Sequence, residues 1–307
     1  MSAHVVVGAG PVGSAVTRLL AGRGEQVRLV SRRGRGPDDP LVEKVAADAA
    51  DPAALGRVAA GAATLFDCAS PPYHRWPAEW PPLAAATIAA AEASGAVLAS
   101  VNNLYPYGPV TGPITEDLPL RPAGPKAATR ARTWLDALAA HEAGRIRTVE
   151  VRGSDYLGAG TMSLLTELVL PRVLAGRRAS VPADLDAPHS WTYVGDMAHT
   201  LVALAADARA WGRAWHAPTP PPLSIRALAT RAAELAGAAA PRLATMPAAV
   251  LRLGGLFDPT VRELRETQYQ FRGPFVLDST AVTSTFGIEP TPTDTALAET
   301  TDALRTA

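Results

Sequence analysis

Three glycines near the amino terminus have the spacing of a dinucleotide-binding turn. In the stretch VVVGAGPVGSAV, Gly8, Gly10 and Gly13 form a G-x-G-x-x-G pattern between an apolar run and a helical pattern. In that setting the first glycine permits a tight turn, the second lets the backbone approach a pyrophosphate, and the third lets helix and strand pack closely. Pro11 and Val12 fall in the first helical turn, whose free N–H groups face the phosphates. The pattern therefore predicts a dinucleotide site.

The end of the next apolar run bears on which dinucleotide is bound. The run QVRLV is followed by Ser31, Arg32 and Arg33, where an Asp or Glu normally holds the ribose 2′-hydroxyl. An acid would repel a 2′-phosphate, whereas a guanidinium can pair with it through two hydrogen bonds. We therefore expect NADP(H) in preference to NAD(H), and the alternative interpretation is a solvated basic turn.

Two further positions are expected near the cofactor. Asp48 follows the third predicted strand, where an acid can accept a hydrogen bond from the adenine amino group. The alternative role, a helix cap, suits Asp51 before Pro52 better. Ala69 follows the fourth predicted strand, TLFDCA, and its small side chain would allow the cofactor to approach closely.

These positions require a scaffold that brings strand ends to one edge. Short Val- and Leu-rich runs alternate with longer helical patterns in the first half, which predicts a doubly wound α/β fold with a parallel sheet. We expect this NADP-binding Rossmann domain over residues 1–155, with residues 191–216 returning to it. Residues 156–190 and 217–307 are expected to form a smaller, mostly helical substrate-binding lobe.

Composition argues against several other classes of protein. The chain has 29 basic and 29 acidic residues, so charge gives no reason to expect nucleic acid or an anionic membrane as a partner. A single cysteine, Cys68, allows no internal disulfide and is too few for a zinc site, so a reducing cytosol is the simpler compartment. Neither a signal peptide nor a membrane span is expected from the sequence, and the oligomeric state stays open.

The landmarks along the chain resemble those of the extended or atypical short-chain dehydrogenase/reductases, the NAD-dependent epimerase/dehydratase group. They occur in the family's order over almost the full length, as GAGPVG, ADAAD, YPYGPVTGPITEDLPLRP, VEVRGSDYLGAG, WTYVGDMAHTLVAL and GRAWHAP. The resemblance implies a Rossmann fold, a nicotinamide cofactor and hydride-transfer chemistry on a small molecule.

The residues that carry this family's chemistry are replaced. Family members use a Ser or Thr after the fifth strand and Tyr-x-x-x-Lys on the next helix, where the Tyr protonates the carbonyl oxygen and the Lys holds the nicotinamide ribose. Counting from EDLPLRP puts Lys126 at the Tyr position and Arg130 at the Lys position, and Asn103 falls at the Ser position. In another register Lys126 is the family Lys and Pro122 the lost Tyr, but that register spoils the P-x-x-P match.

The proton source is therefore an open question. Lys126 is a poor donor unless burial lowers its pKa, Arg130 can hold ribose or an oxyanion, and Asn103 can donate through its amide. Tyr105 and Tyr156 are the alternative phenols. Our hypothesis is that the substrate brings its own acid. A ketone beside a phenol, as in aromatic polyketides, has an internally polarised carbonyl, and the enzyme mainly orients the reactants.

Large side chains after the fourth strand and in the second lobe are candidates for the substrate pocket. Those in the Pro-rich segment SPPYHRWPAEW are expected to form a lid, and the alternative role for all of them is packing in the core. The candidates are Tyr73, His74, Trp76, Tyr156, Met162 and Trp191.

These observations favour an NADPH-dependent ketoreductase acting on a bulky aromatic secondary metabolite, such as an angucyclinone-type polyketide in antibiotic biosynthesis. A sugar-nucleotide epimerase or dehydratase is the commonest activity of the resembled family, but oxidising an unactivated sugar hydroxyl needs the missing base. A non-catalytic NADP(H)-binding sensor with a protein partner is the third possibility.

Overall fold

Seven parallel strands form the central sheet within the described part of this computed structural model, residues 3–247, 250 and 265–306. Their spatial order is β10-β6-β5-β4-β1-β2-β3. Strands β2 and β3 are added on one side of β1 and the later strands on the other, so the strand order reverses between β1 and β4. In open α/β sheets, ligands bind outside the carboxyl ends of the strands at such a point. The strands are β1 (Ala3–Val7), β2 (Gln26–Ser31), β3 (Val42–Ala46), β4 (Ala62–Asp67), β5 (Val97–Asn103), β6 (Arg147–Gly153) and β10 (Ala214–His216).

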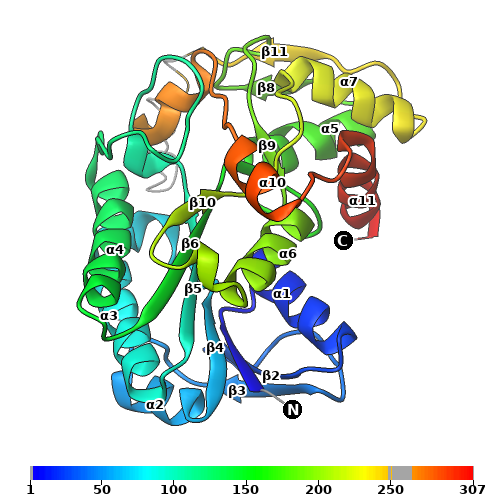
Figure 1. The fold of residues 1–307 in the computed structure, drawn as a ribbon. Helices are drawn as coiled ribbons and strands as arrows, with labels where there is room; N and C mark the ends of the chain where they lie inside the picture. Colours follow the sequence, from blue (N-terminus) through cyan, green and yellow to red (C-terminus); the bar gives the residue numbers. More distant parts are fainter. Residues whose placement is uncertain (1–2, 248–249, 251–264, 307) are drawn as a thin grey trace.

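Helices cover both faces of this sheet (Figure 1). Successive side chains of a strand point to opposite faces, and in β1 Val6 joins the core on one face while Val5 and Val7 join the core on the other. Burial on both faces explains the unbroken valine run in the sequence. The first face carries α1 (Pro11–Gly22) and α6 (Val194–Ala205), and the second carries α2 (Pro52–Ala59), α3 (Trp76–Ser94) and α4 (Pro125–Glu142).

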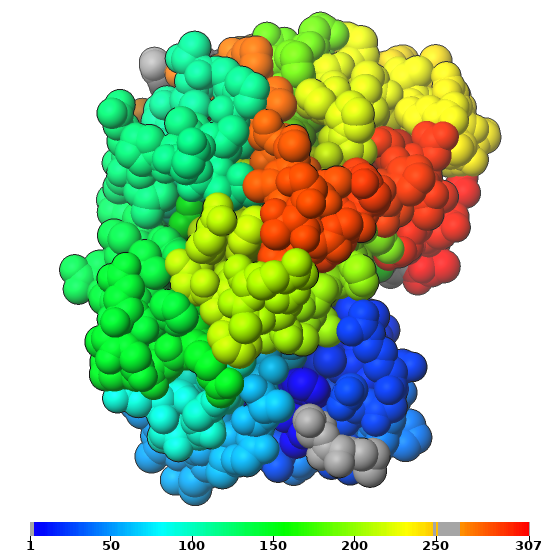
Figure 2. All heavy atoms as spheres, viewed as in Figure 1, coloured from blue at the N-terminus to red at the C-terminus, as the bar shows by residue number. Residues whose placement is uncertain are grey.

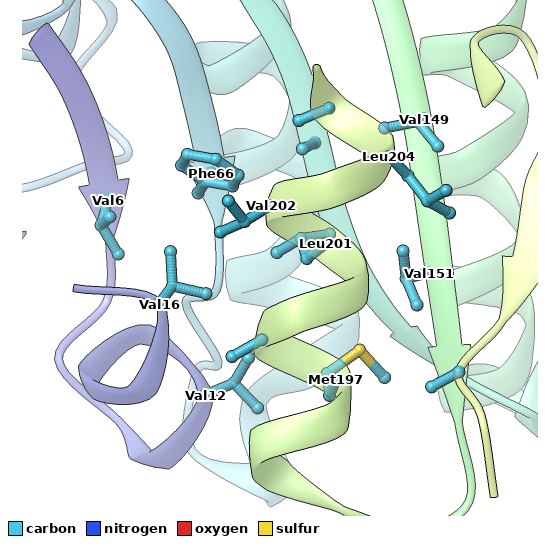
Figure 3. Packing of buried hydrophobic residues seen from close by; sticks show 14 of the residues in the cluster. Val6, Val12, Val16, Phe66, Val149, Val151, Met197, Leu201, Val202 and Leu204 are labelled. Atoms are coloured by element: carbon cyan, nitrogen blue, oxygen red, sulfur yellow. The ribbon is translucent and has the colours of Figure 1, made fainter. Parts of the chain in front are cut away.

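Helix α6 packs against the sheet although it follows a long excursion of the chain. Met197 and Leu201 of α6 lie between Val16 of α1 and Val151 of β6 (Figure 3), and all four side chains are fully buried. Each such side chain contributes about 1.5–3 kcal/mol through burial. Strand β10 then pairs with β6 in parallel, which returns the chain to the edge of the sheet.

A second lobe lies over the carboxyl ends of the strands (Figure 1), and the outline of the molecule is indented between α1 and α11 (Figure 2). Besides helices it contains two short parallel strand pairs, β7 with β9 and β8 with β11, which the sequence did not predict. Helix α7 begins after Ser224, whose side chain caps it by accepting a hydrogen bond from Ala227 N. The elements are β7 (Asp155–Leu157), the π-helical turn η3 (Leu165–Val169), α5 (Leu170–Leu174), β8 (Ala179–Val181), β9 (Trp191–Tyr193), η4 (Ala208–Ala210), α7 (Ile225–Leu235), β11 (Leu243–Thr245), η5 (Gln268–Phe271), α10 (Thr280–Phe286) and α11 (Thr293–Thr306).

The aromatic segment after β4 is helical, so the prediction of a Pro-rich lid loop was wrong. After a short turn η1 (Tyr73–Arg75), α3 begins at Trp76 and continues through Pro81 and Pro82. Trp76 stacks edge-on against Trp80 one turn later, with ring centroids 4.8 Å apart. Each of the two prolines lacks a backbone N–H and so removes a hydrogen bond from the helix. We attribute the helix to this apolar packing, which offsets the resulting loss of stability. None of the helices described here combines the length and apolar character needed to cross a membrane.

Candidate functional site

The glycine turn after β1 brings three segments of backbone into close contact. Gly8 has φ +98°, and a Cβ there would lie 2.6 Å from the Cα of Ala69. A Cβ on Gly13 would lie 1.8 Å from the carbonyl oxygen of Gly8, whereas one on Gly10 would meet nothing within 4 Å. Gly8 and Gly13 are therefore required by packing, while the open space beside Gly10 leaves room for a ligand.

The start of α1 has the properties of a phosphate site. Gly10 is the N-cap, no side chain caps the helix, and Pro11 occupies the first turn. The first amide groups of a helix have no partner within it and carry a partial positive charge, so they suit an anion. These observations fit the pyrophosphate of a dinucleotide, which would lie between this turn and Ala69.

The end of β2 presents two exposed cationic side chains. Ser31 exchanges hydrogen bonds with the backbone of Arg35, at 2.9 and 3.0 Å, which closes the turn. Arg32 and Arg33 are exposed, and neither has an ion-pair partner among the residues that the structure describes. Both guanidinium groups are thus available to a 2′-phosphate.

The two acids near β3 have different surroundings. Asp48 is exposed two residues beyond the strand and accepts a hydrogen bond from Ala50 N at 3.0 Å. Asp51 caps α2, accepting from Ala53 N at 2.9 Å and Ala54 N at 3.2 Å. The capping role thus falls on Asp51, and Asp48 keeps an exposed carboxylate at the edge of the sheet.

A buried acid lies at the end of β4, beneath the expected path of the cofactor. Asp67 is 6% exposed, and its carboxylate accepts a hydrogen bond from Ala69 N at 3.3 Å. Burial raises the pKa of Asp67 to about 6, although the nearby Arg130 guanidinium acts in the opposite direction. Burial also raises the pKa of the Cys68 thiol, so this thiol is inert as a nucleophile.

Lys126 lies at the start of α4 in an ion pair with the second lobe. Its side chain is 1% exposed, and Nζ lies 3.2 Å from Oε2 of Glu266. The other carboxylate oxygen of Glu266 accepts from Lys126 N at 2.8 Å and from Ala127 N at 3.4 Å. Glu266 therefore caps α4 from 140 residues away in sequence. A Cβ on Gly124 would lie 2.5 Å from this carboxylate, which explains the glycine there.

Arg130 is held within the protein by groups of β5 and α3. Its Nε donates to Oδ1 of Asn102 at 2.7 Å, and Nη2 donates to the carbonyl oxygen of Val101. The guanidinium carbon lies 3.8 Å from the centre of the Trp80 ring. Burial lowers the pKa of Arg130 to about 10, so the side chain stays cationic at neutral pH. Part of its donor set is already used, which leaves less for ribose than the sequence suggested.

A buried polar network that the sequence analysis missed continues from Arg130 across β6. Asn102 donates to Oε2 of Glu150 at 2.8 Å, and Nε of Arg152 donates to Oε1 of the same carboxylate at 2.8 Å. Arg152 also donates to the hydroxyl of Tyr107 at 2.7 Å. Asn102, Glu150 and Arg152 are each at most 2% exposed. The polar residues inside the strand RTVEVR were the available signal, because a buried strand is otherwise apolar.

The network ends at His216 on β10. Nδ1 lies 2.8 Å from the carbonyl oxygen of Asp278, which can only accept, so Nδ1 carries the hydrogen. Nε2 then accepts from the hydroxyl of Tyr107 at 2.9 Å. Burial lowers the pKa of His216 to about 4 and keeps the ring neutral. The groups from Arg130 to His216 thus bind one another inside the protein, while Nη2 of Arg152 is buried and has no hydrogen-bond partner among the described residues.

Tyr105 belongs to an aromatic cluster at the end of β5. Oδ1 of Asn103 accepts a hydrogen bond from Tyr105 N at 3.1 Å and so fixes the turn η2 (Tyr105–Tyr107). The ring centroid of Trp76 lies 5.9 Å from that of Tyr105 and 5.0 Å from that of Tyr73. Asn103 therefore holds the backbone of Tyr105 in this turn.

Tyr156 has a buried hydroxyl group that lacks a hydrogen-bond partner among the described residues. Burial raises its pKa far above the usual value, while the charge of Arg130 acts in the opposite direction. An unpaired buried hydroxyl is costly, so a ligand that accepts or donates there would be stabilised. Its closeness to Cys68 and Arg130 places Tyr156 at the same sheet edge as the glycine turn.

The remaining predicted substrate residues do not gather around one cavity. Trp76 is 8% exposed and donates to the carbonyl oxygen of Pro71 at 3.0 Å. Trp191 is 3% exposed within the lobe core, and its Nε1 donates to Leu223 O at 2.8 Å. His74 is exposed, and Met162 is 83% exposed. The structure therefore brings Tyr73 and Trp76 together with Tyr105, and it places Trp191 in the core.

An Asp–His pair in the second lobe was also not predicted. Nε2 of His189 lies 2.8 Å from Oδ2 of Asp155, and the His189 ring stacks against Phe271 and Phe275 with centroids 5.0 and 5.4 Å away. Asp155 lies on β7, directly after the sheet edge, and its charge acts on Tyr105. The pair thus links the lobe core to the aromatic cluster.

Comparisons with known proteins agree with this fold. Residues 4–215 match the profile of the NAD dependent epimerase/dehydratase family. The comparison with curated proteins gives no match.

Solved structures of full length are similar to this chain. Bordetella bronchiseptica WbmH in complex with NAD+ is 20% identical over 99% of both chains, with a TM-score of 0.77. Thermus thermophilus UDP-glucose 4-epimerase with NAD is 19% identical over 100% of both, with a TM-score of 0.76. Streptomyces venezuelae DesIV, a dTDP-glucose 4,6-dehydratase, is 22% identical over 100% of this chain and 97% of its own, with a TM-score of 0.77. At these identities the likeness establishes the Rossmann-type fold.

Proposed function

Since the chain belongs to the NAD dependent epimerase/dehydratase family, we propose that it is an NADPH-dependent ketoreductase acting on a bulky aromatic ketone. One observation carries the proposal. By the count from EDLPLRP, Lys126 stands at the position of the family's tyrosine, and its ammonium is buried and paired with Glu266. A paired ammonium cannot accept a proton from an alcohol, so oxidation of an unactivated hydroxyl lacks its base on α4. Reduction of a ketone needs positive charge near the carbonyl oxygen, which this site has.

Two groups of residues would bind the cofactor. The backbone of Gly8, Gly10 and Gly13 and the start of α1 would hold the pyrophosphate, and Arg32 and Arg33 would hold a 2′-phosphate. The bound nicotinamide supplies hydride when reduced. The proteins of similar fold are described in complex with NAD, so the preference for NADP(H) is our inference from the two exposed arginines.

The charges and the aromatic rings at the carboxyl ends of the strands favour a flat ketone as the substrate. Lys126 and Arg130 carry positive charge that stabilises negative charge developing on the carbonyl oxygen. Tyr73, Trp76 and Tyr105 form an aromatic wall, which offers stacking partners to a fused-ring substrate. A ketone beside a phenol, as in an aromatic polyketide, would arrive with its carbonyl already polarised.

A sugar-nucleotide epimerase or dehydratase is the second candidate. It is favoured by the full-length likeness to an enzyme described as a UDP-glucose 4-epimerase and to one described as a dTDP-glucose 4,6-dehydratase. It requires a base for the sugar hydroxyl, and α4 offers Lys126 and Arg130 in place of the family's Tyr and Lys. A dinucleotide-binding sensor is the reading that remains if neither reaction occurs.

The decisive experiment follows NADPH oxidation by the purified protein with a panel of bulky aromatic ketones, with and without a neighbouring phenol. In parallel, UDP-glucose and dTDP-glucose are incubated with the protein and NAD+, and the sugars are analysed. We expect turnover of ketones alone. Epimerised or dehydrated sugar would favour the second candidate, and tight NADPH binding with no product from either panel would favour the sensor.

The cofactor preference is tested with Arg32→Ala. Loss of a charge-assisted hydrogen bond to the 2′-phosphate should raise the KM for NADPH about 10- to 100-fold and leave the KM for NADH unchanged. Arg23→Ala is the matched control, because Arg23 is exposed at the opposite end of α1. An unchanged KM for NADPH in the Arg32 variant would contradict the preference.

A further inference from the structure

The aromatic cluster also brings two phenols against the ammonium of Lys126. Nζ of Lys126 lies 4.8 Å from the centre of the Tyr73 ring. The hydroxyl of Tyr73 lies 3.0 Å from Oγ1 of Thr267, and the rings of Tyr73 and Tyr105 both pack against Trp76, with centroids 5.0 and 5.9 Å from the Trp76 ring. These groups come from η1, η2, α4 and the segment before η5, all of which meet at the carboxyl edge of the sheet. A phenol and an ammonium are thus assembled from separate elements.

Both phenols stay protonated at neutral pH. Burial raises the pKa of Tyr73 and, to a greater extent, that of Tyr105. The hydrogen bond with Thr267, the neighbouring Tyr105 hydroxyl and the charge of Lys126 act in the opposite direction on the pKa of Tyr73. Tyr73 is therefore the phenol of the pair that gives up its proton more readily to a neighbour, and Tyr105 is a neutral O–H donor.

We propose that Tyr105 donates the proton to the substrate oxygen and that Tyr73 is the relay that resupplies it, an inference that rests on the ketone reduction proposed above. As hydride from the reduced dinucleotide adds to the carbonyl carbon, the π electron pair of the C=O bond moves to oxygen. The Tyr105 O–H bond breaks, and its proton forms the new alcohol O–H. The Tyr73 hydroxyl then reprotonates Tyr105 and regains its own proton from water. The dinucleotide is oxidised and the ketone is reduced.

The other phenols near the site lack one part of this arrangement. Tyr107 is bound between Arg152 and His216 inside the protein. Tyr156 has no hydrogen-bond partner among the described residues that could return a proton. Tyr105 is only partly buried, is held in place by Asn103, and has Tyr73 as its neighbour.

The kinetic test uses Tyr105→Phe and Tyr73→Phe with ketones that carry no phenol of their own. We expect kcat to fall at least about 100-fold in the Tyr105 variant and less in the Tyr73 variant, with the NADPH Kd unchanged. Because burial raises the pKa of Tyr105 well above its ordinary value of 10.0, the donor keeps its proton and the wild-type kcat should not decline up to about pH 10. Tyr193→Phe is the matched control, because its hydroxyl donates to Glu299 outside the cluster.

A second measurement needs no turnover. The chain has six tyrosines, so a protein labelled with carbon-13 at Tyr Cζ gives few signals, each assignable by its Phe variant. Tyr73→Phe should shift the Tyr105 signal in the protein without cofactor, and Tyr193→Phe should leave it in place. An unmoved Tyr105 signal would overturn the relay.

The outcomes separate this inference from the function on which it rests. Wild-type turnover of such ketones with an unchanged kcat in both cluster variants would overturn the role of the phenols and leave the ketoreductase in place. Absence of turnover by the wild type with every ketone would overturn both.

Discussion

The two halves of the carboxyl edge of the sheet are built in different ways. On the β1 side, the glycine turn brings backbone against backbone and leaves the start of α1 uncapped by any side chain. On the β5 and β6 side, Arg130, Asn102, Glu150 and Arg152 bind one another inside the protein. The first half keeps polar groups available for a ligand, and the second half uses many of its polar groups for itself.

This difference follows from what each half must bind. A pyrophosphate needs a particular backbone path and the absence of side chains, which a short glycine pattern specifies locally. A reacting carbonyl needs charged and proton-donating side chains, and those can come from any element that ends at the same edge. Three predictions test this contrast, beginning with the largest expected effect.

The buried network should be the most sensitive part of the site. Glu150→Ala removes the partner shared by Asn102 and Arg152 and leaves a buried cation uncompensated, so we expect a loss of about 3–5 kcal/mol in the free energy of unfolding. The control Glu92→Ala removes an exposed ion pair with Arg145 and should cost less than about 1 kcal/mol. Urea unfolding measures both, and equal losses would show that the network is no more important than a surface pair.

Asp67 should make stability depend on pH. Its pKa is raised from 3.8 to about 6, so the folded state holds the proton more tightly than the unfolded state between these values. Above about pH 6 both states are ionised, and the buried charge costs about 3 kcal/mol. Asp67→Asn should therefore be more stable than the wild type near pH 8, and the advantage should disappear as the pH falls towards 4. A constant difference in unfolding free energy over this range would contradict the assignment.

The glycine turn should respond in both stability and binding. A methyl group at Gly13 would overlap Gly8 O, so Gly13→Ala should cost about 1–3 kcal/mol and weaken NADPH binding. A Cβ on Gly22, at the other end of α1, would meet no atom within 4 Å. Gly22→Ala should therefore increase the free energy of unfolding, by at most about 1 kcal/mol. Thermal unfolding would measure the stability of the two variants, and fluorescence titration would measure their affinity for NADPH. Equal stability and equal affinity would contradict the idea that Gly13 is required by packing and Gly22 is not.

The sequence predicts well what is encoded locally. The parallel sheet follows from Val-rich runs alternating with helical patterns, and the glycine turn follows from a spacing of six residues with the required strand before it and helix after it. The start of α3 was missed because Pro81 and Pro82 suggested a loop, whereas Trp76 and Trp80 pack together as one helical turn.

Contacts between residues far apart in the sequence could not be predicted from local sequence patterns. Nothing near Lys126 in sequence indicates that its partner is Glu266, and nothing near Tyr105 indicates that it shares the Trp76 ring with Tyr73. Asn102 was passed over in favour of its neighbour Asn103, because counting from the family pattern cannot tell which of two adjacent amides points inward. The fold was therefore predicted more fully than the reactive half of the site.

Glu266 has a practical consequence for protein engineering. A helix that carries functional positions is usually treated as part of the domain to which its strands belong, and domains are exchanged between relatives on that basis. Here the first turn of α4 is completed by a carboxylate from the opposite lobe, against a glycine that leaves room for it. A chimera that joins this sheet to another relative's lobe must therefore transfer Gly124, Lys126 and Glu266 as one unit.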